Sequence, residues 1–209
     1  MDPEIPIIWI TGPWSSGSTA LTGWFENLGA YGCPPYQKTN DPRTPNSYES
    51  KALRDKLCEC RNELTLETKD DALEKNLLAW FQDWKKTQES IAIQQGHNYL
   101  VLKHPLLAYY IQDLRSAADR IILITRPLQD IEKTRRRRGW HKTYGNSGAK
   151  LIYSKLFNTY LKNSISYQAV AYAHFLTHEP YRKELAQNLK LLYSEKQWKN
   201  AEQWIKNGR

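Results

Sequence analysis

The 209-residue sequence has no apolar run long enough to cross a lipid bilayer. Its longest strongly apolar stretch, from Ile5 to Ile10, is about six residues long, whereas a membrane-spanning helix needs about 20. The opening residues, Met1 to Glu4, are acidic where a secretory signal is basic and then apolar. We therefore expect a soluble protein that is made and kept in the cytoplasm and has no membrane partner.

Cysteine is scarce as well. There are three cysteines, Cys33, Cys58 and Cys60, and a small odd number does not build a disulfide scaffold. A Cys-x-Cys pair with no histidine close to it in the sequence is also a poor metal site. We expect reduced thiols in a cytosolic protein and no bound metal.

The sequence also lacks internal repeats and low-complexity segments. Its 40% hydrophobic and 25% charged residues are typical of a soluble globular protein, which excludes a disordered or collagen-like chain. The length is enough for one compact α/β domain or two very small ones, and the alternation of strands and helices along the chain favours a single domain over residues 1–209.

Positive charge is plentiful and unevenly spread. The net charge of the chain is +8, and residues 103–150 alone hold 11 Lys and Arg against 4 Asp and Glu, a net +7. Such a region predicts an anionic partner, which could be a nucleic acid, a phospholipid surface or a polyanionic cofactor. Composition alone leaves these three open.

The pattern of apolar residues predicts alternating strands and helices. Strands are expected at 5–10, 99–102, 120–125 and 189–193, and helices at about 18–28, 64–94, 106–117, after Pro127 and at 150–176. Residues 30–50, rich in Pro, Gly, Asn and Tyr, predict a long functional loop. This alternation favours a parallel β-sheet flanked by helices.

The strongest local signal is the stretch Gly-Pro-Trp-Ser-Ser-Gly-Ser-Thr that begins at Gly12, between the first strand and the first helix. Gly12 and Gly17 let the backbone wrap closely, so that N–H groups at the start of the helix converge on one anion. Ser16, Ser18 and Thr19 add hydroxyl donors at the same place. We therefore predict a phosphate-binding loop in a single-domain α/β fold of the P-loop NTPase-like kind.

One residue of that loop limits the chemistry. The frame is G-x-x-x-x-G-K-[ST], but Ser18 stands at the lysine position. Nucleoside-triphosphate enzymes use that lysine on the β- and γ-phosphates and the next hydroxyl on Mg²⁺. The substitution argues against transfer of a γ-phosphate and favours an anion that needs no metal.

A second anion site is predicted where the strand at 120–125 ends. Arg126 follows this strand directly, at the carboxyl edge where open α/β sheets bind ligands, and Thr134 lies about two helical turns later. A guanidinium and a hydroxyl so spaced can reach one phosphate together. The alternative is that Arg126 pairs with Asp130. The run of four arginines that begins at Arg135 predicts a solvated face.

Taken in order, these pieces resemble the PAPS-dependent sulfotransferases, which use 3′-phosphoadenosine 5′-phosphosulfate. The stretch from Thr11 to Leu21 is similar to the family's 5′-phosphosulfate loop, x-S-G-T-T-x-L. The stretch Leu102-Lys-His-Pro is similar to its K-x-P or K-T-H-x-P strand end, and the arginine and hydroxyl after the strand at 120–125 resemble its 3′-phosphate site. The stretch Asn46-Ser-Tyr-Glu is similar to one common in bacterial members, and Leu191-Leu-Tyr to a late strand. Residues 55–95 have no counterpart in this resemblance.

The resemblance implies roles for particular residues. The cofactor-binding set would be Ser15, Ser16, Gly17, Ser18 and Thr19 for the 5′-phosphosulfate, and Arg126 with Thr134 for the 3′-phosphate. The family usually has Lys or Arg where this chain has Ser15, and that cation stabilises the leaving phosphate. Lys103, at the end of a neighbouring strand, could supply the charge instead; otherwise the chain would be a catalytically weak nucleotide-binding relative.

The implied reaction moves a sulfuryl group from PAPS to a hydroxyl or amine of a small-molecule or glycan acceptor, leaving PAP, without a metal. His104 is the first candidate base because a neutral imidazole can accept a proton near pH 7. Glu49 is the second candidate, and Lys103 completes the predicted catalytic set.

Two other functions stay open. A P-loop nucleotide or small-molecule kinase would share the strand–loop–helix start, although Ser18 argues against it. A non-enzymatic module that binds nucleic acid through residues 103–150 would explain the charge, but no zinc-finger or RNA-recognition signature supports it, and we expect no nucleic-acid partner. The sequence carries no signal for an oligomeric state.

Overall fold

The computed structural model describes residues 5–41 and 44–207, so the acidic opening from Met1 to Glu4 lies outside the described residues. Its centre is a four-stranded sheet in the order β4-β1-β5-β6, and every neighbouring pair is parallel. The strands are β1 (Ile7–Thr11), β4 (Leu100–Lys103), β5 (Arg120–Thr125) and β6 (Gln168–Ala171). The predicted α/β fold with a parallel sheet flanked by helices is confirmed.

Both faces of the sheet are buried, which explains why its strands read as continuous apolar runs. Alternate residues of β1 enter two separate cores: Ile7 and Trp9 face one, and Ile8 and Ile10 face the other. All four side chains are at most 1% exposed.

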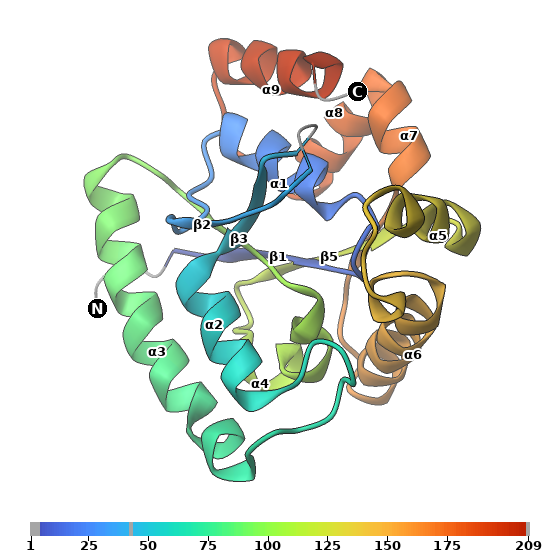
Figure 1. Cartoon of the computed structure of the whole chain (residues 1–209). Helices are drawn as coiled ribbons and strands as arrows, with labels where there is room; N and C mark the ends of the chain where they lie inside the picture. Colours follow the sequence, from blue (N-terminus) through green and yellow to red (C-terminus); the bar gives the residue numbers. More distant parts are fainter. Residues whose placement is uncertain (1–4, 42–43, 208–209) are drawn as a thin grey trace.

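Helices cover the two faces in two groups (Figure 1). One face carries α1 (Ser18–Asn27), α7 (Tyr172–Thr177), α8 (Glu179–Asn188) and α9 (Glu195–Asn207). The other carries α2 (Lys51–Cys60), α3 (Asp71–Gln94), the 3₁₀ turn η1 (Pro105–Tyr109), α4 (Ile111–Leu114) and α6 (Asn146–Lys162). Between β5 and α6 lie α5 (Leu128–Arg137) and the short 3₁₀ turn η2 (Lys142–Tyr144).

The segment predicted as a long loop contains a small antiparallel hairpin, β2 (Tyr36–Lys38) and β3 (Asn46–Ser50). The Tyr36 and Tyr48 rings lie 5.4 Å apart between centroids and give the hairpin its own packing. Because β3 runs directly into α2, the hairpin is fixed to the domain at that end.

Three predictions about elements were wrong. The expected helix at 64–94 begins only at Asp71, as α3, because Asp70 caps it by accepting the N–H groups of Ala72 and Leu73; the preceding helix α2 was not predicted. The expected strand at 189–193 is irregular, because Lys190 has a φ of 49° and Leu192 is 68% exposed. The fourth strand is instead β6, inside the segment predicted as a helix at 150–176.

None of the helices in the described part of the chain is long and apolar enough to span a membrane. The parallel strands β1, β4 and β5 all end at the same edge of the sheet, as parallel register requires. That edge therefore brings together the segments that follow each strand, which hold the predicted site residues.

Candidate functional site

A cleft of about 620 Å³ lies at this edge of the sheet. We divide it into two ends. The loop end is formed by residues 15 and 17–19, Lys103, Arg126 and Thr134, and the Glu63 end by Arg54, Glu63, Trp140 and Tyr144. Tyr172, Leu176, Trp204 and Ile205 add an apolar wall beside residues 17–20, and Glu49, Arg137 and Arg138 also line the cleft.

The loop between β1 and α1 is shaped to bind an anion. Gly17 is the N-cap of α1 at φ 100°, so no side chain in the described chain caps the helix, and its first turn holds no acidic residue. The positive end of the helix dipole therefore faces the cleft uncompensated. Ser16 supports this reading, because its hydroxyl oxygen is buried and has no hydrogen-bond partner among the described residues.

Tyr172 packs directly against this loop. A Cβ atom added to Gly17 would overlap the Tyr172 ring, so only glycine leaves room for the tyrosine. The Arg126 guanidinium lies over the same ring, 4.8 Å from its centroid. The first turn of α7, far along the chain, thus forms part of the loop end.

Lys103 brings a cation to the loop from the end of β4. Its side chain is 4% exposed, and Nζ donates to Thr19 Oγ1 at 3.1 Å and to Ser18 Oγ at 3.4 Å. Nζ also lies 3.2 Å from Glu49 Oε1. Burial lowers the pKa of Lys103, and the charge of the Glu49 carboxylate opposes that shift. The ammonium therefore sits beside Ser18, the residue that replaces the lysine of nucleoside-triphosphate enzymes.

Arg126 and Thr134 both line the loop end, so the structure brings together the two residues predicted for the second anion. Arg126 Nη1 donates to the Ser15 carbonyl at 2.9 Å, which ties β5 to the loop. The alternative pairing with Asp130 is not what the structure shows, since Asp130 contacts Lys133. The Thr134 hydroxyl donates to the Asp130 carbonyl one turn earlier in α5.

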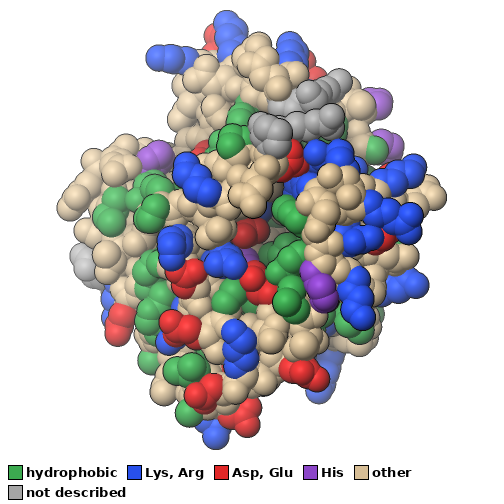
Figure 2. Space-filling view, in the orientation of Figure 1, with side chains coloured by type: hydrophobic (Ala, Val, Ile, Leu, Met, Phe, Trp, Pro, Cys, Tyr) green, Lys and Arg blue, Asp and Glu red, His purple; other side chains and the backbone are tan. Residues whose placement is uncertain are grey.

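The arginine run divides into two pairs with different partners. Arg135 and Arg136 contact Glu132 on the outer side of α5. Arg137 and Arg138 contact the buried Asp41 carboxylate and line the cleft. Figure 2 shows Lys and Arg side chains gathered over α5. The prediction of a merely solvated face is therefore right for Arg136, which is 74% exposed, and wrong for Arg138, whose side chain is 14% exposed.

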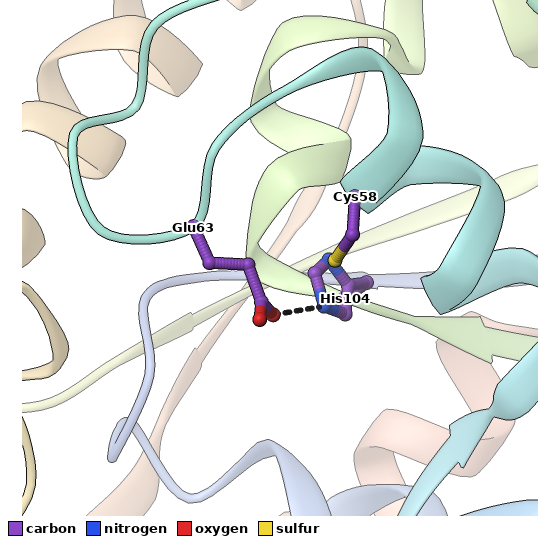
Figure 3. A group of neighbouring side chains, drawn as sticks. All are labelled: Cys58, Glu63 and His104. Carbon is purple, nitrogen blue, oxygen red and sulfur yellow. Dashed lines mark hydrogen bonds and ion pairs between the residues drawn. The ribbon is translucent and has the colours of Figure 1, made fainter. Parts of the chain in front are cut away.

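His104, the first candidate base, lies behind the cleft. Among the residues described, those that line the cleft include Glu63 and Pro105 but not His104, whose side chain is fully buried. Its Nδ1 accepts the N–H of Leu106 at 3.2 Å, so the ring proton is on Nε2, which lies 3.2 Å from Glu63 Oε1 and donates to it (Figure 3). In this arrangement neither nitrogen offers a lone pair to the cleft.

Glu63 and Arg54 were not found from the sequence, since they lie outside every matched motif. Arg54 Nη2 donates to Glu63 Oε2 at 2.9 Å, so the carboxylate is held by both Arg54 and His104. Burial by itself would raise the pKa of Glu63, but the hydrogen bond from His104 and the charge of Arg54 lower it to about 2. Glu63 is therefore ionised at neutral pH.

Cys58 completes this group, and the donor atoms of Cys58, Glu63 and His104 lie within 4.8 Å of one another (Figure 3). Such a set can bind zinc only with a thiolate and an unprotonated histidine nitrogen. Here burial and Glu63 raise the pKa of the Cys58 thiol to about 12, and the proton of His104 is on the nitrogen that faces Glu63. In this arrangement the three groups form a hydrogen-bonded cluster around the Glu63 carboxylate, and a metal would have to displace the protons of Cys58 and His104.

Aromatic rings form the wall of the Glu63 end. The Trp14 and Tyr144 ring centroids are 4.8 Å apart, and Tyr144 contacts Trp140 edge-on at 5.8 Å. Burial raises the pKa of Tyr144 to about 12, so its phenol is neutral at physiological pH. With Arg54 paired to Glu63, this end combines apolar surface with charges that are already matched.

No known protein-family profile matches the sequence, and no curated protein gives a significant sequence match. The fold does match solved structures. One is the sulfotransferase domain from the Synechococcus PCC 7002 olefin synthase, with a TM-score of 0.58 and 17% sequence identity, over 94% of this chain and 78% of that one. The chain therefore has a sulfotransferase, P-loop-like α/β fold.

Proposed function

We propose that this protein is a PAPS-dependent sulfotransferase that acts on a hydroxyl or amine of a small molecule or a glycan. The observation that carries the proposal is the loop end itself. Within the described residues it has an uncapped helix N-terminus, a buried Ser16 hydroxyl without a partner, and the Lys103 ammonium at Ser18 and Thr19. Similarity of fold to a sulfotransferase domain is consistent with it.

The residues present suit a ligand with two separate anionic groups. Residues 15–19 and Lys103 would hold the 5′-phosphosulfate, and Arg126 with Thr134 the 3′-phosphate. The side chains of Tyr172, Leu176 and Trp204 form an apolar wall of the cleft, against which the purine of the ligand would pack. Lys103, rather than a loop lysine, would provide the cation beside the leaving phosphate.

When bound, PAPS supplies the sulfuryl group: a bond forms between sulfur and the acceptor heteroatom, the bond from sulfur to the bridging phosphate oxygen breaks, and PAP leaves with that electron pair. Lys103 and the N-terminal N–H groups of α1 stabilise the negative charge that develops on PAP. The acceptor would bind at the Glu63 end, where the Trp140 and Tyr144 rings would exclude water and restrict its orientation.

The acceptor proton needs a group that faces the cleft. His104 offers no free nitrogen there, so its part is to orient Glu63. Glu63, ionised and with lone pairs remaining beyond those used by its donors, accepts the hydrogen bond of the acceptor hydroxyl and passes the proton to solvent. Its low pKa makes it a weak base, and alignment of the acceptor is its larger contribution.

A kinase remains the second candidate, because Lys103 restores an ammonium to a loop that lacks its own lysine. In such a kinase the ammonium would come from Lys103 on β4 rather than from a lysine on α1. A sulfotransferase should be stabilised by PAP, whereas a kinase should be stabilised by ATP with Mg²⁺.

Thermal unfolding with millimolar PAP, compared with ATP plus Mg²⁺ and with ADP, tests the proposal, because a ligand that binds only the folded state raises the midpoint. We expect a rise with PAP, abolished in Arg126→Ala and kept in Lys133→Ala, a control on the exposed side of α5. A rise with ATP and Mg²⁺ and none with PAP would overturn the proposal in favour of the kinase.

A further inference from the structure

Lys103 is a buried cation whose partners differ in kind. Its side chain is 4% exposed, and an ammonium so far from water requires compensation by other charges or by hydrogen bonds. Two of its three contacts are neutral hydroxyls, Ser18 Oγ and Thr19 Oγ1. The third is the Glu49 carboxylate, whose side chain is 12% exposed. Glu49 is therefore the contact that carries the compensating charge.

The hairpin holds Glu49 in this position. Ser47 Oγ accepts the N–H of Glu49 at 3.1 Å, and the Ser47 carbonyl accepts the Thr19 hydroxyl at 3.2 Å. Between Ser47 and Glu49, the backbone turns at Tyr48, which has a φ of 59°. The Tyr48 ring packs on Trp204. The hairpin is thus attached to the start of α1, at the point that Lys103 reaches.

We propose that Glu49 is a positioning residue. Its carboxylate, on the hairpin β2–β3, keeps the Lys103 ammonium charged and directed at the loop. The ammonium then replaces the loop cation that this chain lacks at Ser15 and Ser18. Glu49 then acts through Lys103 and is not the base that takes the acceptor proton. The inference rests on the proposed function only for the identity of the anion, PAP or PAPS.

Other charged groups near Lys103 work against its ammonium. Arg138, at the end of α5, lowers the pKa of Lys103, as burial between β4, α1 and the hairpin does, and the charge of Glu49 opposes both. Removing that carboxylate lowers the pKa of Lys103 further, so the lysine loses its proton at a lower pH. Below that pH the ammonium stays in place, and above it the loop loses its cation.

The first test is PAP affinity by calorimetry at a series of pH values from neutral to alkaline, because the pKa of Lys103 lies below its usual value. In Glu49→Gln we expect affinity near that of the wild type at the lower pH and at least about tenfold weaker at the upper, because a charge-assisted contact is lost. Glu49→Asp keeps a carboxylate, so its loss of PAP affinity at the upper pH should be smaller than that of Glu49→Gln. Glu195→Gln, in an exposed pair with Lys199, is the control and should match the wild type throughout.

A second measurement needs no ligand. In Glu49→Gln the buried ammonium has lost its countercharge, so the urea midpoint should fall at neutral pH, and the additional change Lys103→Met should restore it at least in part. A loss of PAP affinity in Glu49→Gln that is equal at every pH, or a midpoint that Lys103→Met does not raise, overturns the inference. If wild-type protein does not bind PAP while the unfolding result holds, the proposed function fails and the role of Glu49 stands.

Discussion

The loop end and the Glu63 end of the cleft differ in how far apart in the sequence their residues lie. The predicted phosphate-binding part of the loop end is one unbroken stretch between β1 and α1, whereas Arg54, Glu63 and Tyr144 come from three separate segments: α2, the irregular residues after it, and η2. The loop end has an uncapped helix N-terminus and a buried Ser16 hydroxyl with no hydrogen-bond partner among the described residues, but the charges of the Glu63 end are already paired with one another.

This difference indicates which kind of ligand each end of the cleft favours. Unsatisfied donors at the loop end favour a ligand that carries its own negative charge, and they lose little by binding it. Matched charges and aromatic rings at the Glu63 end favour a neutral acceptor, because a charged acceptor would have to compete with Arg54 or Glu63 for a partner.

The largest effect is expected at the loop end, from Gly17→Ala. The new Cβ overlaps the Tyr172 ring, and alanine is strained at φ 100°, so we expect the free energy of unfolding to fall by about 3 kcal/mol. Urea unfolding measures it. Gly96→Ala is the matched control, because Gly96 has a φ of 78° with open space around the added Cβ, and it should cost about 1 kcal/mol. Equal losses at the two glycines would mean that Tyr172 does not close the loop.

A middle-sized effect is expected at the Glu63 end, and it depends on pH. The pKa of Glu63 is lowered to about 2, so its ion pair stabilises the fold above the unfolded-state pKa and this stability is lost as the pH falls from about 4.5 towards 2. Glu63→Gln should therefore cost on the order of 2 kcal/mol at pH 7, and the gap to the wild type should narrow in acid.

Urea unfolding at several pH values checks this, with Glu59→Gln, an exposed carboxylate paired with Lys56, as the control. The control should differ from the wild type by less than about 0.5 kcal/mol at all pH values. A Glu63→Gln gap that stays constant with pH would contradict the paired arrangement of Arg54, Glu63 and His104.

The smallest effect is expected from Cys58→Ala. A neutral thiol beside Glu63 contributes one weak hydrogen bond and some packing, so the loss should be about 1 kcal/mol or less. Thermal unfolding of the wild type with added Zn²⁺ extends this test, and we expect no rise in the midpoint. A rise that disappears in Cys58→Ala would show that the group is a metal site after all.

Sequence reasoning was most successful where structure and motif are local. The strand at 120–125, the loop that begins at Gly12 and the neighbours Arg126 and Thr134 follow from short-range spacing, and the structure brings them to one cleft. The parallel sheet follows from the alternation of strands and helices, whereas the order of its strands and the identity of its fourth strand do not. These features depend on residues within one or two elements of each other.

What depends on side-chain direction could not be predicted in this way. Lys103 and His104 are adjacent, and residues adjacent in an extended chain point to opposite sides, so only the lysine reaches the cleft. The partner of each is set by tertiary packing: Glu49 comes from the hairpin, and Glu63 from the irregular segment after α2. No spacing in the sequence encodes either pair. The roles assigned to the site residues, to PAPS and to cytoplasmic location stay predictions.

The contact between Gly17 and Tyr172 has a consequence for synthesis of the chain. The loop is synthesised long before the ring that closes it, because that ring belongs to α7, and β6, which leads into α7, is the last strand of the described sheet along the chain. A nascent chain that still lacks α7 would have an open loop without its apolar wall and without the ring under Arg126. We therefore expect the loop end to be complete only once β6 and α7 have packed against the rest of the domain.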